Sequence, residues 1–178
     1  MLEEEKHPVA VLERSDNFLF RTPVVEDGKQ IWQLIKDTGV LDVNSSYSYL
    51  LWTKYFDDTS VIVESNGLLV GFISGFIQPK APDTLFVWQV AVDASQRGKG
   101  LASRMLQALL HSYTCRNIRY LEATVSPSNK ASQALFRKLA RDIETDCRVM
   151  DCFTEEQFPG KGHEAEHLFT IGPLQTEK

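Results

Sequence analysis

Residues 88–102 combine the residue types and the order that a phosphate-binding turn requires. An apolar run at 88–92 is followed by Gly98 and Gly100, and then by an apolar pattern that begins at Leu101. Glycine lets the backbone approach a ligand closely and adopt conformations that other residues resist. The free amides and the positive dipole end of a helix start favour a phosphate, and Arg97 and Lys99 add charge. The segment therefore predicts an anionic ligand where a strand gives way to a helix.

Two better-known nucleotide loops are excluded, because neither GxGxxG nor GxxxxGK[ST] occurs in this stretch. A simple turn at Gly98 and Gly100 remains the alternative. The hydrophobic strand before the glycines and the amphipathic helix after them favour the phosphate-binding interpretation.

The segment 97–102, with the sequence RGKGLA, resembles the [QR]-x-x-G-x-[GA] pyrophosphate loop of the GNAT-type N-acetyltransferase superfamily. Residues 126–139 resemble the second signature of that superfamily. The resemblance implies that acetyl-CoA pairs with the strand at Val90, Ala91 and Val92. It also implies cofactor contacts from the loop and from the later helix: Arg97, Gly98, Lys99, Gly100, Leu101, Ala102, Asn129 and Phe136. Many members have a tyrosine where this chain has Phe136, so the role of general acid does not carry over.

Residues 41–51 resemble the L-D-x-N-S-x-Y-x-Y-L-L stretch of the diaminobutyrate acetyltransferases, and residues 88–93 and 163–169 fit the same family. This resemblance implies acetylation of L-2,4-diaminobutyrate on its 4-amino group, as a step of ectoine biosynthesis. We expect direct acyl transfer in a ternary complex, without a covalent enzyme intermediate and without a metal.

A diamino acid carries two ammonium groups and one carboxylate, so its pocket needs acidic groups and hydrogen-bond donors. Asp42 and Glu166 are expected to meet ammonium groups, and the ring of Trp88 offers a face to a cation. Donors to the carboxylate are expected from Asn44, Ser45 and Tyr47. His163 completes the expected acceptor contacts. The expected catalytic groups are Glu166 as proton acceptor, the amide of Val92 as donor to the thioester carbonyl, and Tyr47.

Each of these side chains also has a structural interpretation. Asp42 and Ser46 could cap a helix, and Tyr49 and Trp52 could pack the core. Glu164 and Glu166 could be a solvated run, and His163 a surface residue. A zinc site with His163 or His167 is disfavoured, because no ligand pair has a suitable spacing.

The elements that must position these residues follow from hydrophobic periodicity and turn residues. Strands are expected at 18–21, 59–64, 68–77, 84–92, 118–125, 142–153 and 167–171, with a hairpin turn at Asn66 and Gly67. Helices are expected at 24–38, at 46–56, from about residue 98, and after a cap at Ser128. This order predicts an α/β chain with a GNAT-like fold: a mixed, mostly antiparallel sheet of six or seven strands with about four helices.

Composition bounds the rest. The 178 residues suit one domain, expected at 17–178 behind a flexible lead-in at 1–16. The net charge of −5 opposes nucleic-acid binding, and no apolar run is long enough for a membrane span. Three cysteines without CxxC spacing favour a reduced compartment, and no signal peptide is visible, so the protein is expected in the cytoplasm.

The resemblance to the superfamily also implies that the protein forms a homodimer through its C-terminal strands. Two other functions stay open. The same fold could acetylate another amine, such as a polyamine, an aminoglycoside or a protein N-terminus. It could also be a non-catalytic acetyl-CoA-binding module, which Phe136 would favour. The aromatic-rich segment 41–56 favours a small closed pocket over an open peptide groove.

Overall fold

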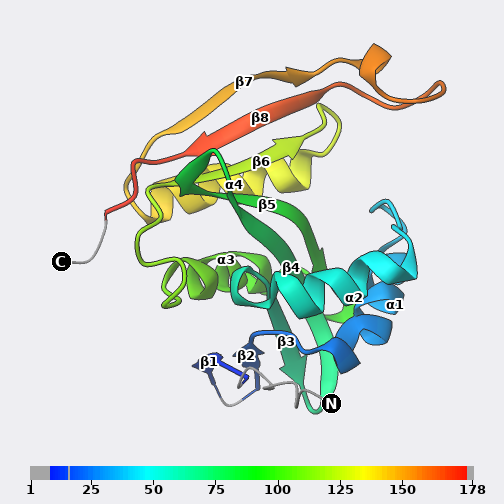
Figure 1. Cartoon of the computed structure of the whole chain (residues 1–178), viewed down its shortest axis with the longest axis vertical. Helices are drawn as coiled ribbons and strands as arrows, with labels where there is room; N and C mark the ends of the chain where they lie inside the picture. Colours follow the sequence, from blue (N-terminus) through cyan, green and yellow to red (C-terminus); the bar gives the residue numbers. More distant parts are fainter. Residues whose placement is uncertain (1–8, 16, 176–178) are drawn as a thin grey trace, which may run out of the picture.

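The computed structural model describes residues 9–15 and 17–175, in which one eight-stranded sheet runs through the molecule (Figure 1). The strands are β1 (Val11–Arg14), β2 (Leu19–Arg21), β3 (Val61–Ser65), β4 (Leu68–Gln78), β5 (Ala81–Val92), β6 (Tyr120–Val125), β7 (Cys147–Phe153) and β8 (Glu166–Ile171). The helices are α1 (Gly28–Thr38), α2 (Ser46–Tyr55), α3 (Leu101–Leu110) and α4 (Lys130–Asp142). The sheet order is β1-β2-β3-β4-β5-β6-β8-β7, and β5–β6 is its parallel pair. This confirms the expected fold class.

Two apolar clusters on opposite faces hold the helices to the sheet. Ile31 and Ile35 of α1 pack with Tyr49 and Trp52 of α2 against Phe72. On the other face, α3 and α4 bury Met105, Leu109, Phe136 and Leu139. α1, α3 and α4 therefore present an apolar stripe to the sheet, as amphipathic helices do, whereas α2 buries Tyr49 and Trp52 but also exposes Tyr47, Leu50 and Tyr55.

The sheet has one strand more than the six or seven expected, because β1 lies within the segment 1–16 that we expected to be a lead-in. β1 pairs antiparallel with β2, from Val11 opposite Arg21 to Arg14 opposite Leu19. Arg104 of α3 forms an ion pair with Glu13, which ties the strand to the sheet's helical layer. Residues 1–8 and 16 lie outside the described residues.

Local turn and cap chemistry mostly follows the sequence. Asn66 and Gly67 have φ values of 51° and 75°, which confirms the expected hairpin turn. The cap of α4 differs from the expectation: Asn129 is the N-cap, and its side chain accepts a hydrogen bond from the amide of Ser132, 3.0 Å away. Ser128 is one residue too early for this role.

A bulge in β5 decides which side chains face which helices. Ser74 and Gly75 of β4 lie opposite Gln89 and Val87, so Trp88 is the extra residue. Before the bulge, Leu85 and Val87 pack toward α3 and α4, whereas Ala91 packs toward α1 and α2. Because successive strand residues alternate faces, the extra residue is what moves the odd-numbered positions to the other face.

β5 and β6 pair over a short distance and then separate (Figure 1). Their register runs from Thr84 opposite Tyr120 to Phe86 opposite Glu122, while β6 stays paired with β8 as far as Val125. The second half of β5 therefore has a free edge toward β6. Among the described residues, no helix has the length and apolar character of a membrane span.

Candidate active site

A groove of about 910 Å³ opens where β5 and β6 separate. Its walls are the end of α1 with the residues after it, the last residues of β5, the segment 96–103, and the start of α4. The groove thus brings the glycine-rich segment, which could hold a phosphate-bearing ligand, next to the unpaired edge of β5.

The glycine-rich turn supplies main-chain donors at one end of the groove. Gly98 and Gly100 have φ values of 76° and 74°, a left-handed conformation that costs other residues about 1–2 kcal/mol each. Arg104 makes the first helical hydrogen bond, to the carbonyl of Gly100, and no side chain caps α3. The amides of residues 101–103 therefore have no acceptor within the helix and are available to a phosphate.

Asp93 fixes the turn between β5 and this loop. Its carboxylate accepts hydrogen bonds from the amide of Ser95 at 2.9 Å and from the Ser95 hydroxyl at 2.6 Å. These bonds lower the pKa of Asp93, so the turn is held by an ionised carboxylate at neutral pH.

The free edge of β5 supplies donors at the other end of the groove. The amide of Asp93 donates to the carbonyl of Val70 in β4. Because amide directions alternate along an antiparallel strand, Ala91 also faces β4, and the amides of Val90 and Val92 point toward β6. Beyond Phe86 the structure pairs no β6 residue with them, so these amides can bind an extended ligand.

Most of the expected cofactor contacts line the groove: Val90, Ala91, Val92, Arg97, Gly98, Gly100, Leu101, Ala102 and Asn129. Lys99 does not, because its ammonium binds the side-chain oxygen of Gln96 at 3.0 Å. Phe136 does not either. It is 3% exposed and packs against Phe169, so it is a core residue.

The acceptor residues lie outside this groove and converge from distant segments. Asp42 lies between α1 and α2, whereas Glu166 begins β8. Loss of solvent raises the pKa of Glu166, and the negative charges of Glu164 and Asp42 add to that rise. His163 and a hydrogen bond with Thr124 act in the opposite direction. The charge of Asp42 therefore acts on Glu166, although the two residues belong to distant segments of the chain.

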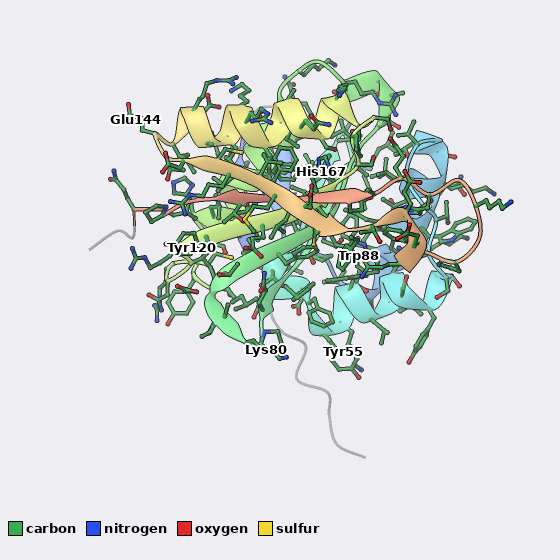
Figure 2. The ribbon with its side chains drawn as sticks, turned by 90° about the horizontal axis from the view of Figure 1, so that it is seen from above. Tyr55, Lys80, Trp88, Tyr120, Glu144 and His167 are labelled. Carbon is green, nitrogen blue, oxygen red and sulfur yellow. The ribbon has the colours of Figure 1, made fainter. Side chains whose placement is uncertain are left out.

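Trp88 of β5 packs against α2 and leaves part of its indole ring exposed to solvent. Its ring centroid lies 5.1 Å from that of Trp52 in α2, and 47% of the residue is exposed. Figure 2 shows Trp88 next to α2, on the side of the sheet away from α4. An indole in this position can meet a cation with its free surface.

The remaining expected acceptor residues, Asn44, Ser45 and Tyr47, lie at the start of α2. Ser45 is the N-cap of α2, in place of the expected Asp42 or Ser46, although its side chain makes no capping bond. Tyr47 is 65% exposed, and the amide of Asn44 donates to the Tyr49 hydroxyl. Tyr49 and Trp52 are buried, which confirms the core interpretation for both.

His163 is held by the loop between β7 and β8. Its ring stacks on Phe158 with centroids 3.7 Å apart and planes at 10°. The neighbouring Glu164 accepts a hydrogen bond from Ser128, which lines the groove at the start of α4. This loop thus joins the acceptor side to the groove. No cluster of three or more potential metal ligands occurs in residues 9–15 and 17–175.

Sequence reasoning missed several residues of the site. Lys130 and Lys138 line the groove, and their spacing on α4 was a usable signal. Gln89 was also missed, although a polar residue inside an apolar strand was a usable signal. Thr124 and the groove residues at the end of α1 carry no local signal, because only tertiary packing brings them there.

Comparisons with known proteins agree with this geometry. The model of the acetyltransferase (GNAT) family matches residues 28–140. The chain is 58% identical over 167 residues to the L-2,4-diaminobutyric acid acetyltransferase of Sporosarcina pasteurii, covering 93% of each chain. It is 40% identical to the protein of the same name from Nocardia farcinica, covering 98% of this chain and 92% of the relative.

Solved structures extend the comparison. The diaminobutyrate acetyltransferase EctA from Paenibacillus lautus, in complex with L-2,4-diaminobutyric acid and coenzyme A, has a TM-score of 0.87 and 45% identity, covering 92% of this chain and 99% of that one. The ribosomal L7/L12 alpha-N-protein acetyltransferase RimL has a TM-score of 0.70 at 18% identity, covering 92% of this chain and 98% of that one, which shows a shared fold alone.

Proposed function

The chain belongs to the GNAT family of acetyltransferases and groups there with the L-2,4-diaminobutyric acid acetyltransferases; from this premise we propose that it acetylates the 4-amino group of L-2,4-diaminobutyrate. The product is N4-acetyl-L-2,4-diaminobutyrate, an intermediate of ectoine biosynthesis. The observation that carries the proposal is the groove that joins the free edge of β5 to the glycine-rich turn, in a chain that is 58% identical to an L-2,4-diaminobutyric acid acetyltransferase.

Acetyl-CoA supplies the activated acetyl group as a thioester. The amides of residues 101–103 and the guanidinium of Arg97 hold its pyrophosphate, and the amides of Val90 and Val92 hold its extended arm. The Val92 amide donates to the thioester carbonyl as negative charge develops there. One such donor contributes about 3–4 kcal/mol in enzymes where it has been removed.

Glu166 serves as the proton acceptor for the attacking amine. An alkyl ammonium has a pKa of about 10.4, so little free amine exists at neutral pH. Partial burial raises the pKa of Glu166, which makes it a better base than an exposed glutamate. Phe136 cannot protonate the departing thiolate, so that proton comes from water or from another group.

Selectivity for the 4-amino group requires that the other end of the substrate is gripped. Asp42 pairs with the 2-ammonium, and Asn44, Ser45 and Tyr47 supply donors for the carboxylate. Trp88 covers the cationic end. Both substrates are then held together in a ternary complex, and that proximity contributes much of the acceleration.

The assembly we propose is a cytoplasmic homodimer. β7 is the last strand of the sheet, and it exposes Val149, Met150 and Phe153. An apolar edge strand of this kind suits pairing with a second copy. The three cysteines are all free, which fits a reducing compartment.

The test is a thiol-release assay with acetyl-CoA and a panel of amines, followed by NMR of the product. Release with 2,4-diaminobutyrate, weak release with ornithine, spermidine, an aminoglycoside and a peptide, and acetyl on N4 support the proposal. Release with another amine of the panel in its place supports the first alternative. Binding of acetyl-CoA without release with any amine supports the non-catalytic module.

A further inference from the structure

Gln89 has a buried polar side chain that the mechanism above does not use. It is 6% exposed and lies on the face of β5 that packs against α1 and α2, among apolar residues such as Phe72 and Ala91. A buried side-chain amide without hydrogen-bond partners would strongly destabilise the fold. Its partners therefore indicate what the residue is for.

Both ends of the Gln89 amide are bound to the segment that carries the acceptor residues. Its side-chain nitrogen donates to the carbonyl of Asp42 at 2.9 Å, and its oxygen accepts from the Tyr49 hydroxyl at 3.3 Å. The Tyr49 hydroxyl in turn accepts from the amide of Asn44 at 3.3 Å. One side chain thus holds the main chain on both sides of Val43, directly and through Tyr49.

The orientation of the amide is fixed by these partners. The carbonyl of Asp42 can only accept, so the nitrogen of Gln89 must face it. The Tyr49 hydroxyl uses its proton on the oxygen of Gln89 and its lone pair on the amide of Asn44. Every polar atom of this small network has a partner, so the network defines one arrangement of the segment.

Gln89 also lies next to the groove side of β5. Trp88 before it is the bulge residue, and Val90 after it points its amide toward the free edge. The side chain of Gln89 therefore sets the position of Asp42, and the neighbouring Val90 provides a main-chain donor to the acyl carrier. Because the two residues are adjacent in β5, these two positions are fixed relative to each other.

Building on the proposed function, we propose that Gln89, with Tyr49, is a positioning residue that sets Asp42 and Asn44 at the distance from the thioester that places the 4-amine for attack. Gln89 does not line the groove, and its side chain is bound to Asp42 and Tyr49. It acts through the segment between α1 and α2, in which Leu41 packs against the apolar cluster of α1, α2 and the sheet.

The test compares Gln89→Met, which keeps the volume and removes both hydrogen bonds, with Tyr49→Phe, which removes only the hydroxyl. Both should raise the KM for diaminobutyrate about fivefold or more, as expected for the loss of buried hydrogen bonds, and leave the KM for acetyl-CoA within about twofold. Thr59→Val is the matched control, because it removes a buried hydroxyl that donates to the carbonyl of Gly75, away from this segment. It should lower the melting temperature without changing either KM.

A double-mutant cycle separates positioning from a general structural role. If Gln89 acts through the segment of Asp42, the effect of Gln89→Met on the KM for diaminobutyrate should shrink in an Asp42→Ala background. If the effects of Gln89→Met and Asp42→Ala on the KM for diaminobutyrate multiply fully, the inference is wrong. It is also wrong if Gln89→Met raises the KM values for diaminobutyrate and acetyl-CoA equally. If Gln89→Met does not fold, Tyr49→Phe is used in its place in the same cycle. Wild-type turnover of diaminobutyrate, measured alongside, tests the proposed function separately.

Discussion

The two sides of the site are built in different ways. The groove is lined by the end of β5, the segment 96–103 and the start of α4, where main-chain amides at 90, 92 and 101–103 have no partner in the described sheet or helix and glycines at 98 and 100 shape the turn. The acceptor side is made of side chains from the α1–α2 segment, the bulge in β5 and the start of β8. A ligand shared by a whole family can be held by backbone geometry, whereas a particular amine must be selected by side chains. Substitutions should therefore separate the two sides.

Glu166→Gln should give the largest effect. If Glu166 is the proton acceptor that we propose, its removal should lower kcat by about 10²- to 10⁴-fold, the usual contribution of general acid–base catalysis, and leave coenzyme A binding unchanged. Because the pKa of Glu166 is raised by burial, the acidic limb of the wild-type kcat/KM profile should lie above the pH expected for an ordinary glutamate. Steady-state kinetics across pH checks both; a variant with wild-type kcat contradicts the assignment.

Asp42→Ala should weaken the binding of diaminobutyrate without weakening that of acetyl-CoA. Loss of a hydrogen bond to a charged group, worth about 1.5–3 kcal/mol, should raise the KM for diaminobutyrate by roughly tenfold or more. The KM for acetyl-CoA should stay the same, because Asp42 does not line the groove. A parallel rise in both KM values would show that the two sides are not separable.

Gly100→Ala tests the groove. Its left-handed φ of 74° should cost alanine about 1–2 kcal/mol and raise the KM for acetyl-CoA several-fold, with the acceptor KM unchanged. Gly67→Ala is the matched control, since Gly67 has a φ of 75° and equally open surroundings in the β3–β4 turn. If both variants weaken acetyl-CoA equally, strain alone explains the effect and the loop has no special role.

The smallest effect concerns stability. Because folding raises the pKa of Glu166, the folded chain holds this proton more tightly than the unfolded chain. The stability linked to the protonated carboxyl is present at low pH and is lost as pH rises through the raised pKa. The melting temperature of Glu166→Gln relative to wild type should therefore increase between about pH 4 and pH 7. Thermal melts showing the opposite trend would contradict the burial of this carboxyl.

The same division explains what the sequence could predict. The glycine-rich turn before α3, the Asn66–Gly67 turn and the four helices depend on neighbouring residues, and the structure has all of them; the binding of a pyrophosphate by the first of these turns stays a prediction. β1 was missed because it has only four residues and follows a charged stretch, although Val11 and Leu12 continue an apolar run that begins at Val9; the α4 cap was assigned one residue early.

Other features depend on contacts between distant segments. The separation of β5 and β6, the bond of Thr124 to Glu166, and the hold of Gln89 on Asp42 join residues more than 35 positions apart or depend on strand register. Phe136 shows the limit of a motif: it occupies the expected helix, but its ring packs into the core. Periodicity and short motifs carry no information about which distant side chain will meet which.

The most direct test is one calorimetric series in which coenzyme A is titrated into the wild type, Gly100→Ala and Asp42→Ala. The account predicts binding to all three, with the dissociation constant raised for Gly100→Ala alone. No binding to folded wild type, or equal weakening by Asp42→Ala, would contradict the division between a main-chain groove for the acyl carrier and a side-chain pocket for the amine.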